Sequence, residues 1–181
     1  MSAVSEDFAN PAKFNISNGY ENNVPAFANG QLVSALNDNA LDALDLKRHI
    51  FSQLYIGYSG TFFQENHCAC AATSDYAFIN DNRVIDKACR GIYSALIPYL
   101  KGKIIFNADG TIQDTTIAFY QSKALEPLYQ MSRDGDLSQV SESDVYIDPS
   151  QLVKTTGNLQ IVVYLNEDGI ARNITIPISF K

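Results

Sequence analysis

Apolar residues recur every three or four positions along residues 85–96, which is the spacing of one buried face of an α-helix. The positions on this face are Ile85, Ala88, Cys89, Ile92, Ala95 and Leu96. Asn80, Asp81 and Asn82 precede them, and each offers a short side-chain oxygen that can cap a first helical turn. Pro98 lacks an N–H group, so the helix is predicted to kink or end within residues 93–97.

A second helical pattern predicts a long helix that starts at Asp114 or Thr115 and ends near Arg133. Its apolar face consists of Ile117, Tyr120, Ala124, Leu128 and Met131. Pro127 lies inside the pattern and predicts a kink, and Gly135 is the expected stop. An aromatic and methionine face of this kind is typical of a protein core.

The C-terminus changes to a strict alternation of apolar and polar residues, the pattern of a half-buried strand. The apolar positions are Ile174, Ile176, Ile178 and Phe180. An Asp168-Gly169 turn predicts a hairpin in which residues 158–165 pair with residues 170–181. Pro177 predicts an edge position. The final strand belongs either to its own sheet or to the sheet of a neighbouring subunit, and both interpretations stay open.

Shorter patterns complete the fold class. We expect a short helix over residues 40–49, a strand over residues 51–63 that bends at its glycines, and further strands near 74–79, 103–106 and 145–147. The chain is therefore predicted to be an α+β protein, with two long amphipathic helices packed on a mixed or antiparallel sheet and a C-terminal β-hairpin.

Residues 1–38 show no sustained period and are punctuated by proline and glycine. They are either a loop-rich arm or the remnant of a preceding domain, and residues 39–181 form the predicted α+β domain.

Composition excludes several classes of function. The 181 residues carry a net charge of −7, which leaves no basic surface for nucleic acid. Apolar runs stay far below the roughly 20 residues that a membrane helix needs. The N-terminus also lacks the basic start and apolar segment of a secretory signal, which predicts a cytoplasmic product.

One cluster invites a metal or thiol chemistry: His67, Cys68 and Cys70, with Cys89 further along the chain. In an extended strand Cys68 and Cys70 share a face and His67 points away, so the three are poorly placed for one ion. Reduced, buried thiols are the favoured interpretation. A nucleophilic cysteine or serine would need a neighbouring base, and no catalytic sequence motif in the chain supplies one. We therefore predict no catalytic residues, no metal, no cofactor and no enzyme activity.

Several segments in order resemble the C-terminal region of contractile phage tail sheath proteins. They are the runs at residues 75–79, 82–88, 96–100, 107–111, 130–138, 147–151 and 169–174. The resemblance spans roughly residues 40–181. A sheath subunit is usually much longer, and residues 1–40 do not resemble its N-terminal region, so the chain is expected to be a C-terminal portion or a shortened relative.

The resemblance implies a structural subunit that self-assembles into helical rings around a tail tube, in a phage or a phage-like injection apparatus. It implies copies of itself and the tail tube protein as partners, and the virion tail, or the host cytoplasm during assembly, as the location. It also implies that terminal arms add strands to neighbouring sheets, which fits Ile174, Ile176, Ile178 and Phe180. The alternatives are a small thiol- or metal-binding protein that uses the His67 and cysteine cluster, or a monomeric tail adaptor.

Overall fold

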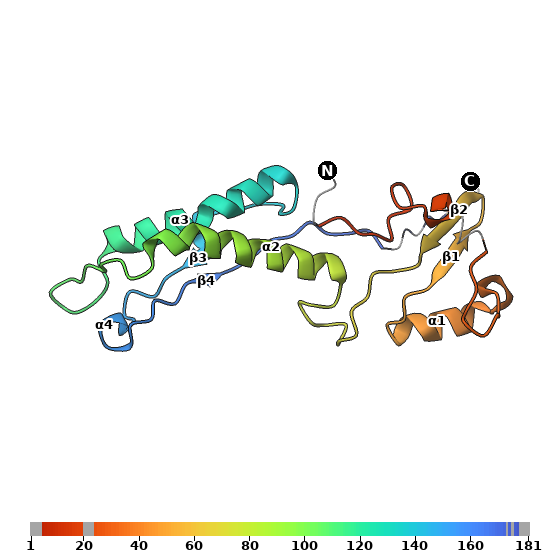
Figure 1. Ribbon diagram of the computed structural model, residues 1–181, viewed down its shortest axis with the longest axis horizontal. Coiled ribbons are helices and arrows are strands. Elements are labelled where there is room, and N and C mark those ends of the chain that lie inside the picture. Colours follow the sequence, from red (N-terminus) through yellow and green to blue (C-terminus); the bar gives the residue numbers. More distant parts are fainter. Residues whose placement is uncertain (1–4, 20–23, 173, 175, 178–181) are drawn as a thin grey trace.

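The computed structural model describes residues 5–19, 24–172, 174, 176 and 177. The molecule is elongated, with two lobes at opposite ends (Figure 1). Residues 79–165 form the helical lobe, which holds the two long helices. Residues 24–63 form the hairpin lobe, and residues 64–78 connect the two.

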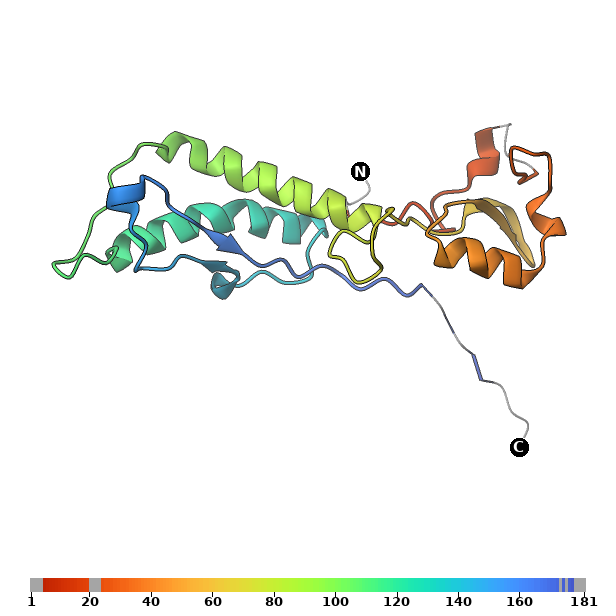
Figure 2. The same ribbon diagram turned by 90° about the horizontal axis from the view of Figure 1, so that it is seen from below.

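Helices α2 (Ile79–Leu96) and α3 (Asp114–Asp134) lie antiparallel in the helical lobe (Figure 2). Gly91 allows a close approach between them, because an added Cβ there would lie 3.0 Å from Cβ of Pro127. The two helices and their neighbours bury one apolar cluster, formed by Val84, Ala88, Ala124, Leu125, Leu128, Met131, Leu137 and Val145. Both long helices were therefore predicted correctly, and the second runs through Pro127 as one element.

The predicted capping residues of α2 have other roles. The helix starts at Ile79, so Asn80, Asp81 and Asn82 fall inside its first turn, and Phe78 is the N-cap without a side-chain bond. Asn80 is buried and accepts a hydrogen bond from Asn66, with 2.6 Å between Nδ2 and Oδ1. At the other end α2 stops at Leu96, where the 3₁₀ helix Ile97–Tyr99 takes over, as Pro98 predicted.

Strands β3 (Val145–Tyr146) and β4 (Val162–Val163) form an antiparallel pair beside α3. Gln121 ties the helix to this pair, since its Nε2 donates to the Val145 carbonyl oxygen over 2.9 Å. The α+β class is confirmed, and β3 and β4 form the C-terminal hairpin. Its strands differ from the predicted segments: β4 lies within 158–165 as expected, but its partner comes from 145–146 instead of 170–181.

The connections of the helical lobe are short local structures. A 3₁₀ turn, Glu142–Asp144, precedes β3, and the short helix α4 (Val153–Thr156) lies between the two strands. The expected strand at 103–106 is reduced to a single bridge between Phe106 and Ile112. The expected strand at 74–79 is reduced likewise, to one bridge between His67 and Phe78.

In the hairpin lobe, α1 (Asp38–Leu46) packs near the hairpin of β1 (Ser52–Tyr55) and β2 (Tyr58–Phe63). Asn37 caps α1 by accepting a hydrogen bond from the Ala40 N–H over 2.8 Å. The single bent strand predicted for 51–63 was wrong. Gly57 has φ of +79°, a left-handed conformation that reverses the chain and makes two paired strands.

Two 3₁₀ turns, η1 (Ile16–Gly19) and η2 (Val33–Ala35), are the regular structure in the described part of residues 1–37. None of the described helices has both the length and the apolar character needed to cross a membrane.

Candidate assembly surface

The described backbone hydrogen bonds of residues 160–166 to the rest of the helical lobe lie along one edge. The Tyr164 N–H donates to the Asp144 carbonyl oxygen over 2.8 Å, and Asn166 accepts from the Ser138 N–H over 3.0 Å. Gln160 continues the same side, because its N–H donates to Gln151 Oε1. All these contacts come from even-numbered positions. In an antiparallel ladder the hydrogen-bonding groups alternate, so those of Ile161, Val163 and Leu165 are directed to the opposite, open edge.

Arg172 anchors the segment that follows. Its Nη1 donates to Asp7 Oδ2 and to Asn66 Oδ1, each over 3.3 Å, and also bonds Glu65. Its guanidinium carbon lies 3.5 Å from the centroid of the Phe78 ring. We call these five residues the Arg172 cluster. Charge-assisted hydrogen bonds and a cation–π contact are combined here, so the anchor is a strong one.

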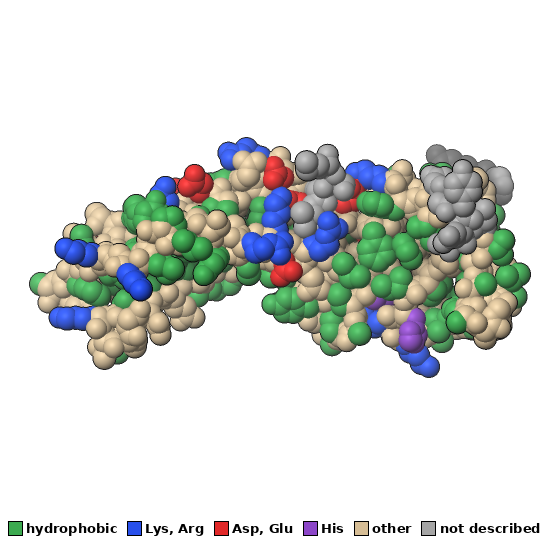
Figure 3. All heavy atoms as spheres, in the orientation of Figure 1, with side chains coloured by type: hydrophobic (Ala, Val, Ile, Leu, Met, Phe, Trp, Pro, Cys, Tyr) green, Lys and Arg blue, Asp and Glu red, His purple; other side chains and the backbone are tan. Residues whose placement is uncertain are grey.

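The Arg172 cluster joins parts of the chain that are far apart in sequence. Glu65 and Asn66 belong to the connection between the lobes, and Phe78 is the N-cap of α2. Asp7 belongs to the N-terminal segment, whose Ser5 bonds the end of α3 through Gly135 and Asp136. Both ends of the chain thus meet at the connection between the lobes, where charged side chains gather (Figure 3).

Carboxylates outnumber the guanidinium in this region. Partial burial raises the pKa of Asp81, although Arg172 opposes the effect. Partial desolvation also raises the pKa of Glu167; the charge of Asp81 adds to this increase and Arg172 counters it. Burial is thus the main cause of both raised pKa values, and Arg172 lies close enough to both carboxyl groups to oppose it.

The predicted assembly strand begins directly after this anchor. Ile174 and Ile176 are 81% and 71% exposed, a high value for isoleucine. Ile178 and Phe180, the other two residues predicted for this strand, lie outside the described residues. The described positions 170–172, 174, 176 and 177 carry no strand assignment. Two isoleucines of the predicted apolar face are therefore available for contact.

An apolar groove of about 720 Å³, the α2 groove, runs between α2 and the open edge of residues 163–167. Its lining includes Ile85, Ala88 and Ile92 from the helix, with Val163 and Leu165 from the strand side.

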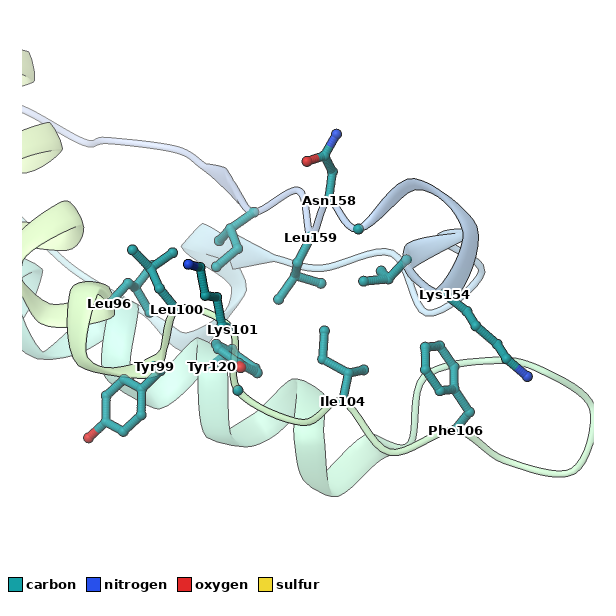
Figure 4. Close-up of a pocket in the computed structure, with 14 residues that line it drawn as sticks. Leu96, Tyr99, Leu100, Lys101, Ile104, Phe106, Tyr120, Lys154, Asn158 and Leu159 are labelled. Atoms are coloured by element: carbon teal, nitrogen blue, oxygen red, sulfur yellow. The ribbon is translucent and has the colours of Figure 1, made fainter.

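A second groove of about 620 Å³, the distal groove, continues beyond the end of α2, between residues 96–106 and 157–161. Leu159 and Ile104 point towards each other across it, whereas Tyr99 and Lys154 point away (Figure 4). Together the two grooves border most of residues 157–167 along one side of the helical lobe.

The thiol cluster does not come together. The Cys68 sulfur accepts from Asn82 Nδ2 over 3.0 Å, and the Cys70 thiol contacts the Tyr76 carbonyl oxygen over 3.1 Å. His67 Nε2 lies 2.7 Å from Asp45 Oδ1. Cys68 and Cys70 are half-buried, and Cys89 is exposed and lines the α2 groove, so the prediction of buried thiols was wrong. Among the described residues, no three His, Cys, Asp or Glu side chains are grouped to hold a metal ion.

Sequence reasoning missed the role of Arg172. The one available signal is that Arg172 is the only basic residue between Lys154 and Lys181.

A family model described as the DUF2586 C-terminal domain matches residues 75–181. Among solved structures, the chain is similar to one in the cryo-EM structure of the anti-feeding prophage (AFP) baseplate, at 17% identity and a TM-score of 0.61. That match covers 87% of this chain and 44% of the other. No curated protein sequence matches the chain.

The chain is also similar to one in the cryo-EM structure of an extracellular contractile injection system, the PVC sheath complex in its contracted state. Identity is 14%, the TM-score is 0.61, and the match covers 83% of this chain and 42% of the other. At these identities the likeness establishes a shared fold. The chain spans less than half the length of either matched chain.

Proposed function

Since this chain belongs to the DUF2586 family through its C-terminal domain, we propose that it is a structural subunit of a contractile tail sheath, in a phage or a phage-like injection apparatus. In this role, copies assemble into helical rings around a tail tube. Its partners in this role are further copies of itself and the tail tube protein, and it is part of a particle. The role involves no catalytic reaction, cofactor or nucleic acid.

The observation that carries the proposal is the fold likeness to a chain of a prophage baseplate and to a chain of a contractile injection system, which extends over most of this chain. One of the two is a sheath complex by its own description. The segments quoted above that resemble tail sheath proteins support the same assignment independently, because they come from the sequence and not from the fold.

The contact that we propose for assembly is a donated C-terminal strand. Ile174 and Ile176 are exposed, share one face of the alternating pattern and follow an anchored segment. A strand added to the edge of a neighbouring sheet gains backbone hydrogen bonds along its length, while alternate side chains enter apolar pockets. Ile178 and Phe180 extend the same face in the sequence.

The test is negative-stain electron microscopy of the complete gene product, produced without other tail proteins. Tubes or stacked rings are expected, and dispersed small particles would contradict self-assembly. Deleting residues 174–181 should abolish the assemblies while the helical lobe stays folded, as judged by circular dichroism. A deletion variant that still forms tubes would remove the C-terminal strand from the proposal.

A matched pair of variants tests whether assembly needs the isoleucine face of the segment and not merely the presence of the segment. Ile174→Asp combined with Ile176→Asp places two charges on the isoleucine face and should prevent assembly. Asn173→Asp combined with Thr175→Asp adds the same charge at the alternate positions and should be tolerated, since these positions point the other way in a strand.

A monomeric tail adaptor is the second candidate, because one of the two matched chains belongs to a baseplate. The two candidates differ in self-association. Sedimentation velocity over a wide concentration range should give one small species for an adaptor and growing assemblies for a sheath subunit.

A further inference from the structure

We propose that Arg172 acts as a catch: it holds the C-terminal strand away from the open edge of its own sheet, where that strand can otherwise fold back as a hairpin. The inference rests on the proposed function, since an open strand is the form that a subunit can donate. The closed hairpin would be the form that cannot assemble.

The sequence supplies a register for the closed form. A four-residue loop at 166–169 places Ile170 opposite Leu165 and Arg172 opposite Val163. The next pairs are Ile174 with Ile161, and Ile176 with Leu159. All these side chains lie on one face of the hairpin, because successive strand residues alternate.

The register also pairs the backbone hydrogen-bonding groups of the open edge. The open edge presents the hydrogen-bonding groups of Ile161, Val163 and Leu165, as the even-numbered contacts on the other side require. In the closed hairpin these positions pair with the even-numbered residues 170–174. The backbone nitrogen of Pro177, which carries no hydrogen, would then face the outer side, where no ladder hydrogen bond is lost.

The grooves are where a third strand would lie. The α2 groove and the distal groove both border the open edge, and they are lined by the half-buried Ile92 from α2 and the exposed Leu100 beyond its end. Folding back would lay Ile174 beside Ile161 and Ile176 beside Leu159, covering the apolar side of the helical lobe. Both isoleucines are exposed in the open form, so closure would bury them.

Arg172 opposes this closure. In the open form it bonds Glu65, Asp7 and Asn66 and lies on the Phe78 ring, at the start of α2. In the closed register it would face Val163 and would lose those four partners; Asp81 and Glu167, which also line the α2 groove, are the carboxylates left near it. The two states therefore compete: burial of isoleucines favours the hairpin, and the Arg172 cluster favours the open strand.

A disulfide between positions 161 and 174 reports closure. In a background with Cys68→Ser, Cys70→Ser and Cys89→Ser, the variant Ile161→Cys with Ile174→Cys is oxidised at low protein concentration. Paired residues in an antiparallel ladder have Cα atoms about 5.5 Å apart, within disulfide reach. In the open form Arg172 lies at one end of α2 and Ile161 near the other, roughly 25 Å away along a helix of this length.

With Arg172 present, we expect little intramolecular disulfide. Arg172→Ala should raise its yield roughly tenfold, the factor by which the loss of one charge-assisted hydrogen bond shifts an equilibrium. Glu65→Gln should raise it in the same direction without altering residues 170–176. Replacing the second cysteine by Thr175→Cys, on the opposite face, is the matched control and should give low yields throughout.

Three outcomes would overturn the catch. Equal intramolecular yields with and without Arg172 would show that it opposes nothing, and absence of the disulfide in every variant would show that no hairpin forms. Disulfides formed only between two chains would assign the open edge to another copy. If the native chain forms tubes but yields do not depend on Arg172, the catch is wrong and the sheath role stands. If yields depend on Arg172 but no assemblies form, the sheath role fails and the catch stands.

Discussion

Leu128 is the residue whose truncation tests the packing of the helical lobe most directly. It is fully buried in α3 and belongs to the cluster that joins α2, α3 and β3. Leu128→Ala removes three buried carbon atoms, which at about 0.8 kcal/mol each amounts to about 2.4 kcal/mol. A residual cavity adds to this value, so the expected loss in the free energy of unfolding is about 3–5 kcal/mol.

The loss can be measured by urea unfolding followed by far-UV circular dichroism, a suitable probe because the chain contains no tryptophan. Leu46→Ala is the control: Leu46 is a helical leucine too, the last residue of α1, but it is 82% exposed. It should change stability by less than about 0.5 kcal/mol. A Leu128→Ala loss as small as that of the control would refute the assignment of this cluster as the core.

Two further changes probe the segment that follows the helical lobe and the turn that ends α3. Glu167→Gln should stabilise the protein at neutral pH, because desolvation raises the pKa of Glu167 and the charged carboxylate therefore opposes folding. The gain in stability should shrink as the pH falls below the ordinary pKa of glutamate, since the wild-type side chain is then neutral as well. Thermal unfolding of both proteins between pH 3 and pH 7 checks the sign, and a gain that grows towards low pH would contradict it. Gly135→Ala should cost about 1 kcal/mol in urea unfolding, because Gly135 ends α3 with φ of +80°; an unchanged midpoint would mean that this turn relaxes.

The helices were predictable because their signals are local. The apolar spacing of α3 and the glycine that ends it, Gly135, belong to one continuous segment of sequence. The structure has the helix over Asp114–Asp134. The residues around Gly57 were harder: a glycine among aromatic residues fits both a bend and a hairpin turn, and only the pairing of β1 with β2 decides between them.

The partner of β4 could not be predicted for a different reason. Its own sequence and the Asp168-Gly169 turn favour residues 170–181, and that local preference is real. The observed pairing with Val145 and Tyr146 depends on the position of α3, which holds Val145 through Gln121. Arg172 was equally hidden, since Asp7, Glu65 and Phe78 approach it only after the chain has folded.

The contacts that close the junction between the lobes have a consequence for the order of folding. Ser5 and Asp136 are 131 positions apart in the sequence, and Asp7 and Arg172 are 165 positions apart. Helices α2 and α3, by contrast, are separated by only the 17 residues 97–113. Long-range contacts form late, since the intervening chain must first be ordered. Each lobe can therefore take shape as the chain is synthesised, whereas the junction must wait until both ends of the chain are present. We expect it to be the last part of the molecule to form and the first to open.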